Sequence, residues 1–194
     1  MKKLFSVLLI LALLCGISVC AFAEAEEKTA EEEKTVMNWE DVQDFIKKSK
    51  LKGDFVTLDE VGAKIWLPDT FQPVELTEED LDTGYIAYYA TEDSAAALAV
   101  VYVDVEGMKL DEYLEALKDL DIEDAEIVTV NGNEAVSYTL EDNDSASLTF
   151  ATEQGCILEF TFAPRSDEAF GPVGTAILTS VQAVEEPAEQ AAEK

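Results

Sequence analysis

Two hydrophobic periods divide the chain into helical and extended segments. From residue 53 onward, apolar side chains recur at every second position in several short runs, which is the period of a half-buried strand. Apolar residues spaced by three and four, typical of amphipathic helices, occur near residues 38–51, 108–120 and 172–181. This pattern predicts an α+β fold in which an antiparallel sheet with a hairpin meander packs against two or three helices.

The first amphipathic segment predicts a helix over residues 38–51. Asn38 is a suitable N-cap, and the acidic residues that follow it complement the positive end of the helix. One face carries the apolar side chains of Trp39, Val42, Phe45 and Ile46. We expect this face to pack on the edge of the domain, and the alternative is a helix that recruits a peptide or lies on a membrane surface.

The extended segments before residue 106 form two predicted strand pairs. The first pair comprises residues 54–60 and 63–68, and the second comprises residues 85–93 and 95–105. The last of these strands is apolar on both faces, so we expect it near the centre of the sheet. The helix predicted at 108–120 has a continuous leucine stripe and should lie on that sheet.

Four further strands make up the predicted meander, at residues 125–130, 134–140, 146–152 and 156–164. Asn131-Gly132 joins the first two and is the preferred sequence for a type I′ hairpin turn, in which both residues need positive φ. In the last two strands, Thr149, Glu159 and Thr161 fall on the face opposite the large apolar residues. We therefore expect one face of the meander to be core and the other to be wetter.

The order of these segments resembles the PsbP-like fold over about residues 63–182. The segments that carry the resemblance are WLPDTF at 66–71, GMKLDEYLEALKDL at 107–120, VNGNEAVSYTL at 130–140, GCILEFTFAP at 155–164 and ILTSVQ at 177–182. The chain looks most like the small exported bacterial members of that group. The resemblance implies a non-enzymatic binding or assembly role. No ligand residue of the plant proteins can be matched to a position in this chain.

Residues 1–23 have the order of a secretory signal peptide. Two lysines precede an apolar run of about eleven residues, and Ala21-Phe22-Ala23 is an A-x-A site that predicts cleavage between Ala23 and Glu24. The alternatives are an uncleaved anchor and a lipid attached at Cys20. The branched Val19 directly before that cysteine disfavours lipidation. We expect an exported, secreted or extracellular protein that is not inserted in a membrane after cleavage.

The chain is strongly acidic, with 42 acidic residues against 13 basic ones and a formal net charge of −29. This charge repels nucleic acids and anionic membrane surfaces, so neither is an expected partner. Residues 24–35 and 185–194 are rich in Glu, Ala and Lys and predict an acidic disordered linker and tail. Between them, residues 36–184 predict a single α+β domain.

The residue types exclude most catalytic machinery. The chain has no histidine, and after signal cleavage Cys156 is the one remaining cysteine, so Ser-His-Asp triads, histidine-bound metals and thiolate clusters are excluded as usually built. No glycine-rich phosphate loop is present. We therefore expect a non-enzymatic domain that has no cofactor and that binds a protein or a small ligand. The alternative is an extracellular hydrolase that depends on a pair of carboxylates.

The acidic loops raise the further hypothesis of weak binding of calcium or another divalent cation. Asp142 and Asp144 are the candidate ligands, together with acidic residues at 119–123. Neither loop has the glycine and glutamate of an EF-hand. A hairpin turn and a helix exit are the interpretations we favour for these loops.

Three tyrosines on one predicted strand are candidates for a groove that holds a glycan or a peptide. The period of two places Tyr85 and Tyr89 on one face and Tyr88 on the other. Ordinary packing within the sheet is the alternative that we favour.

Overall fold

The computed structural model describes residues 34–184 with the exception of residues 121 and 123. The predicted signal peptide, its cleavage between Ala23 and Glu24, the alternative lipid at Cys20, most of the acidic linker and the tail at 185–194 lie outside the described residues and stay predictions. Among the helices of the described part, none is long and apolar enough to cross a membrane.

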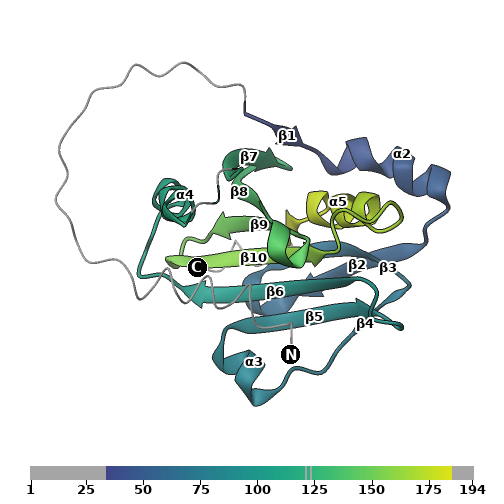
Figure 1. Cartoon of the computed structure of the whole chain (residues 1–194), viewed down its shortest axis with the longest axis horizontal. Helices are drawn as coiled ribbons and strands as arrows, with labels where there is room; N and C mark the ends of the chain where they lie inside the picture. The colour runs from purple at the N-terminus through teal and green to yellow at the C-terminus, as the bar shows by residue number, and fades with distance from the viewer. Residues whose placement is uncertain (1–33, 121, 123, 185–194) are drawn as a thin grey trace, which may run out of the picture.

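The main sheet has eight strands in the order β1-β7-β8-β9-β10-β6-β5-β4 (Figure 1). Every neighbouring pair is antiparallel except β1 and β7, which are parallel. The strands are β1 (Val36–Met37), β4 (Phe71–Pro73), β5 (Tyr85–Thr91), β6 (Ala97–Asp104), β7 (Glu126–Val130), β8 (Asn133–Leu140), β9 (Ser145–Ala151) and β10 (Cys156–Ala163).

A second sheet has three strands in the order β11-β3-β2, namely β11 (Gln182–Ala183), β3 (Ala63–Pro68) and β2 (Gly53–Leu58). The helices are α2 (Trp39–Ser49), α3 (Glu78–Asp82), α4 (Leu110–Asp119) and α5 (Gly171–Thr179). The predicted α+β class, both strand pairs and the meander are confirmed. The sequence did not predict β1, β4, β11 or α3, because each is too short to show a period.

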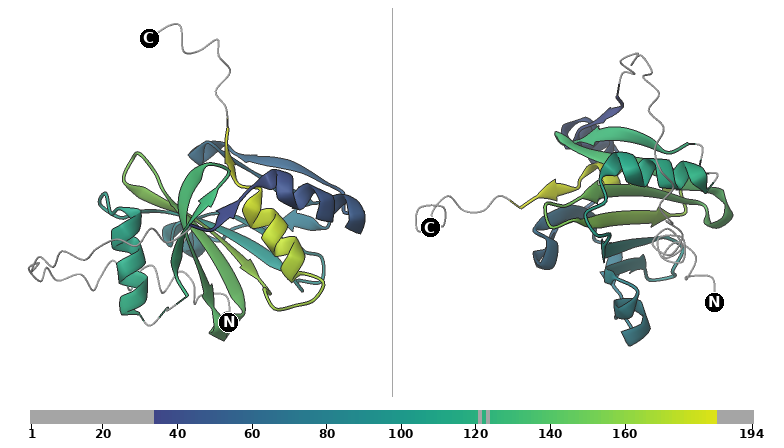
Figure 2. Two further views of the ribbon diagram at one scale, coloured as in Figure 1. Left: turned by 90° about the horizontal axis from the view of Figure 1, so that it is seen from above. Right: turned by 90° about the vertical axis from the view of Figure 1, so that its left-hand side faces the viewer.

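The main sheet is covered on both faces, so the fold has three layers (Figure 2). On one face, α2, α5 and the small sheet enclose the main core, which includes Ile65, Leu98, Val100, Leu148, Phe160, Phe162 and Ile177. On the other face, α4 encloses the α4 core, which includes Val101, Tyr113, Leu117, Val136, Tyr138 and Ile157. In the main core, a Cβ on Gly174 would lie 2.2 Å from the ring of Phe162. Only glycine therefore allows α5 to approach β10 so closely.

The polar face of the meander is buried, and the prediction that it is wetter was wrong. Thr149, Glu159 and Thr161 lie on the side of the sheet that α4 covers, and the Glu159 side chain is only 1% exposed. The alternation of polar and apolar residues was assigned correctly. What the sequence could not show is that the helix at 110–119 crosses this face instead of the apolar one.

The predicted faces of the three tyrosines were also wrong. The pairing of β5 with β6 shifts between Tyr85 and Ala87, where an irregularity of the β-bulge type interrupts the alternation. As a result, Tyr85 packs in the α4 core while Tyr89 packs in the main core. Tyr88 is opposite Ala99, which packs against the α4 core, so Tyr88 shares the face of Tyr85.

Candidate functional site

The turn between β7 and β8 fixes one wall of a cleft. Asn131 and Gly132 have φ values of 49° and 85°, the positive pair that the sequence predicted for this turn. The Asn131 side chain then reaches across the fold. Its Oδ1 accepts a hydrogen bond from the backbone N–H of Trp39 at 2.7 Å, and its Nδ2 donates to the carbonyl oxygens of Thr179 at 2.7 Å and Val181 at 2.9 Å.

Asn131 therefore joins three segments that are far apart in the sequence. It binds the first N–H of α2, the last residue of α5 and the residue that precedes β11. Asn38, which the sequence predicted as the N-cap of α2, makes no side-chain capping bond and instead donates to Asp41 at 3.2 Å. The N-terminus of α2 is thus capped by the side chain of Asn131, from the β7–β8 hairpin, and not by the residue that precedes the helix.

A cleft of about 560 Å³ lies beside this junction. We call it the amide cleft, because five of its lining residues carry side-chain amides; the lining residues are Asn38, Trp39, Glu40, Gln43, Asn131, Asn133, Gln182 and Ala183. Gln43 and Gln182 are half-buried, and within the described part of the chain their side chains have no hydrogen-bond partner. Each presents an unused donor and an unused acceptor to the cleft.

The wall formed by Trp39 is held in place by aromatic packing. Its ring lies 5.3 Å from that of Phe55 on β2, in an edge-to-face arrangement, and 5.8 Å from that of Trp66 on β3. Glu40 is the single charged residue of the lining. The amide cleft is therefore suited to a polar, largely uncharged group, and it lacks the paired carboxylates that acid–base hydrolysis needs.

A second cluster, which the sequence did not reveal as a site, surrounds the buried carboxyl group of Glu159. Its Oε2 accepts hydrogen bonds from the hydroxyl groups of Tyr113 at 3.0 Å, Tyr138 at 2.6 Å and Thr149 at 3.1 Å. Its Oε1 accepts from the Thr161 hydroxyl at 3.0 Å. Burial raises the pKa of Glu159, and the four hydroxyl donors oppose that rise.

The Glu159 cluster is sealed between the sheet and α4. Burial, followed by the nearby Glu159 charge, raises the pKa of Tyr113 and Tyr138 well above the ordinary value, so both phenols stay protonated and remain donors. A carboxyl group with a raised pKa is a common mark of an active site. Here no substrate can reach the group, because its side chain is 1% exposed and its oxygens are already bonded. The cluster therefore serves the fold.

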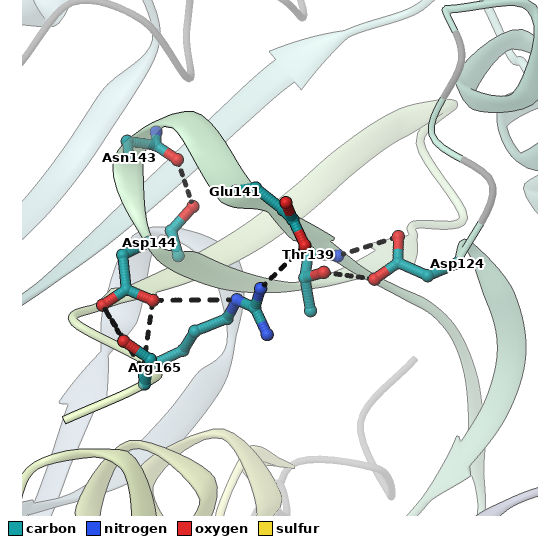
Figure 3. Close-up of polar contacts among 8 residues, drawn as sticks. Asp124, Thr139, Glu141, Asn143, Asp144 and Arg165 are labelled. Atoms are coloured by element: carbon teal, nitrogen blue, oxygen red, sulfur yellow. Dashed lines mark hydrogen bonds and ion pairs between the residues drawn. The ribbon is translucent and has the colours of Figure 1, made fainter. Parts of the chain in front are cut away.

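The acidic turn between β8 and β9 contains both calcium candidates, and Figure 3 shows the contacts of one of them, Asp144. Asp144 has a φ of 51°, and its carboxylate accepts hydrogen bonds from the Ser166 N–H at 3.1 Å and the Ser166 hydroxyl at 2.7 Å. The single arginine of the chain, Arg165, lies with Nε 3.8 Å from Asp144 and a terminal nitrogen 3.7 Å from Glu141. Asp142 is exposed. Asp144 therefore ties the turn to the segment that follows β10.

The acidic residues of this region do not gather into a recognisable metal site. No group of three or more His, Cys, Asp or Glu residues suited to hold a metal ion occurs among residues 34–184 as described. Asp124, near the same turn, is bonded by the hydroxyl and backbone N–H of Thr139. Calcium binding by Asp142 and Asp144 stays a prediction.

Replacing Asp144 separates its structural role from a metal-binding one. In metal-free buffer, we expect Asp144→Ala to lower the free energy of unfolding by about 2 kcal/mol, because the Ser166 bonds and the Arg165 pairing are lost and alanine disfavours a positive φ. Asp142→Ala should change it by less than about 0.5 kcal/mol. Thermal melts of both variants, with chelator and with added calcium, measure these changes. A calcium-dependent rise in melting temperature that both substitutions abolish would instead support the metal site.

Of the tyrosines proposed for a groove, Tyr85 and Tyr89 are buried within the two cores and Tyr88 is half-buried. Burial, helped by the nearby Asp80, raises the pKa of Tyr85 to about 12. Sheet packing thus accounts for Tyr85 and Tyr89, and a ligand contact by Tyr88 stays a prediction.

The fold belongs to the α+β class, and the solved structures with a similar fold include that of a PsbP protein. The solution structure of cyanobacterial PsbP (CyanoP) from Synechocystis has a TM-score of 0.49 and 10% identity, covering 69% of this chain and 93% of that one. The Ran-binding protein Mog1p of Saccharomyces cerevisiae has a TM-score of 0.40 and 9% identity, covering 70% of this chain and 97% of that one. A Bacteroides thetaiotaomicron protein has a TM-score of 0.41 and 14% identity, covering 64% of this chain and 46% of that one. No family model and no curated protein matches the sequence.

Proposed function

We propose that the protein is an exported, non-enzymatic binding domain and that the amide cleft is its ligand site. The observation that carries the proposal is the pair of half-buried side-chain amides, Gln43 and Gln182, which line the cleft without a partner in the described chain. Half-buried polar groups without partners in the protein are available to a ligand that supplies them. The bonded Asn131 and the packed Trp39 hold the surrounding walls in place.

A carboxylate-dependent hydrolase is the alternative, and the lining of the amide cleft favours it less. Such an enzyme needs two carboxyl groups that face one substrate. The amide cleft contributes Glu40 alone. A neighbouring cleft of about 530 Å³ between α2 and the start of α5 is lined by Asp41, Asp167 and Glu168, but Asp167 accepts hydrogen bonds from the N–H groups of Ala169 and Phe170. That carboxylate therefore stabilises the turn that leads into α5.

Two glutamine substitutions test the proposed site. The test is an NMR screen of the purified protein against uncharged polar fragments and short peptides, in which the side-chain NH₂ signals of Gln43 and Gln182 are followed. Binders should shift these signals, and the double substitution of both residues by alanine should weaken binding about 10- to 30-fold, since each lost hydrogen bond contributes about 1 kcal/mol.

Gln72→Ala is the matched control, because Gln72 lies on β4 at the opposite edge of the main sheet and its side-chain amide donates to the Asp69 carbonyl. This variant should bind like the wild type. Binders that map elsewhere, or a saturable hydrolytic activity that one Asp or Glu substitution removes, would contradict the proposal.

A further inference from the structure

We infer that the ligand of the amide cleft is an extended segment of a partner protein, which adds as a strand to the free edge of β11. The inference rests on the proposed function, because it uses the same cleft, and it adds the chemical class of the ligand and the atoms that bind it. β11 lies at one end of the order β11-β3-β2, so one of its two edges faces away from the small sheet.

The register of β11 shows which backbone groups point to that free edge. Gln182 is opposite Lys64 on β3, and the N–H of Val184 donates to the Gly62 carbonyl at 2.8 Å. In an antiparallel ladder, alternate residues direct both of their backbone groups to the partner strand. The N–H and C=O of Ala183 therefore point away from β3, and Ala183 is exposed and lines the amide cleft.

Asn131 already bonds to this same edge. The Val181 carbonyl that accepts from Asn131 lies two residues before Ala183, and it therefore projects on the same side as the free groups of Ala183. A side-chain amide has the same donor and acceptor as a peptide group. Asn131 thus takes the place of a neighbouring strand at Val181. Within the described residues, the backbone groups of Ala183 on the same edge have no partner.

The free amides of the cleft suit a peptide backbone. An added strand presents N–H and C=O groups on both of its sides, and those that do not face β11 need partners of their own. Gln43 lies on α2 and Gln182 on β11, and both line the cleft beside Ala183. The unused donor and acceptor of Gln43 can bond the outer groups of the added strand, while those of Gln182 can bond its polar side chains. This mode of recognition is known as strand addition.

Charge favours a basic partner over a second copy of this chain. The charged residue of the cleft is Glu40, Asp41 follows it, and the chain carries a net charge of −29. Two copies meeting at their β11 edges would bring like charges together. A segment with a lysine or arginine beside the strand would instead pair with Glu40.

Ala183→Pro removes the free N–H without breaking the small sheet. Proline is tolerated on an edge strand where its nitrogen faces solvent, and the N–H of Ala183 makes no bond to β3. The variant should fold and melt like the wild type. Ala183→Ser, which keeps the N–H, is the matched control.

The probe is a random octapeptide library displayed on phage, selected on the wild type after depletion on Ala183→Pro. We expect enriched, basic peptides whose synthetic forms bind the wild type and Ala183→Ser equally and Ala183→Pro at least tenfold more weakly. Methylating the peptide nitrogens one at a time should abolish binding at alternate positions only, since alternate N–H groups face β11.

Three results would overturn the inference. The first is that the selected peptides bind the wild type and Ala183→Pro equally, and the second is that no peptide is enriched after depletion. The third is that the wild type forms a concentration-dependent dimer in ultracentrifugation and that Ala183→Pro abolishes this dimer. Fragments that still shift the Gln43 and Gln182 signals would then leave the proposed function standing with another ligand class. If neither peptides nor fragments bind the cleft, both proposals fail.

Discussion

Replacing Glu159 by alanine is expected to lower the free energy of unfolding by about 4 kcal/mol. The substitution opens a cavity beneath α4 and leaves the buried hydroxyl groups of Tyr113, Tyr138, Thr149 and Thr161 without their acceptor. A buried polar group that loses its partner costs about 1–3 kcal/mol, although hydroxyl groups can rotate toward one another and recover part of this loss. Chemical denaturation at pH 7 measures the change.

The isosteric Glu159→Gln separates the charge of this group from its hydrogen bonds. Burial raises the folded-state pKa of Glu159 above the ordinary value of 4.5, so the folded protein binds the proton more tightly than the unfolded chain does. The stability contributed by this proton is fully present below pH 4.5 and is lost as the pH rises through the folded-state pKa, with a slope of up to about 1.4 kcal/mol per pH unit. Glutamine cannot titrate and should remove that slope.

Urea denaturation of the wild type and Glu159→Gln from pH 4 to pH 8 tests the sign. The stability of the glutamine variant relative to the wild type should rise with pH across the window. Tyr138→Phe is the companion variant, because it removes the 2.6 Å donor while keeping the ring in the core. A difference between the wild type and Glu159→Gln that is independent of pH would show that Glu159 does not titrate in this window.

Replacing Asn131 by alanine is expected to lower the free energy of unfolding by about 3–4 kcal/mol. Three hydrogen bonds disappear, each contributing about 1 kcal/mol, and alanine adds a cost of about 1 kcal/mol at a φ of 49°. Because one of these bonds caps α2, that helix should loosen first. Thermal or denaturant unfolding measures the total loss, and hydrogen exchange at Trp39 reports the helix.

Two control variants divide this loss into its parts. Asn131→Gly removes the same three bonds but accepts the positive φ, so it should lose about 1 kcal/mol less than the alanine variant. Asn133→Ala changes an exposed amide of the same hairpin and should alter stability by less than about 0.5 kcal/mol. Equal losses for the alanine substitutions at residues 131 and 133 would show that Asn131 does not join the three segments.

Local patterns in the sequence predicted the elements of this fold well. The helix expected at 38–51 is observed at 39–49, and the turn at Asn131-Gly132 has the two positive φ values that its residues require. Such features depend on neighbours within a few positions. The irregularity between Tyr85 and Ala87 has no such marker, because every residue around it suits a strand. This irregularity places Tyr85 and Tyr89 on opposite faces of the sheet, although strict alternation predicted one face for both.

The candidate site could not be predicted in the same way, because its residues are distant along the chain. Gln43 lies on α2, Asn131 in the β7–β8 hairpin and Gln182 after α5. Only the folded topology brings them to one cleft. Glu159 did leave a trace in the sequence, as an acidic residue within an otherwise apolar and threonine-containing strand. Because the position of α4 could not be predicted, however, this pattern indicated that the Glu159 side chain is exposed.

The two cores share the strands that separate them. In β6, Leu98 and Val100 face the main core while Val101 faces the α4 core, and β10 alternates between the same two sides. A strand that leaves one core therefore leaves the other as well. We therefore expect the described part of the chain to unfold cooperatively, so that damage to the sheet beneath α4 also destabilises the helices on the opposite face.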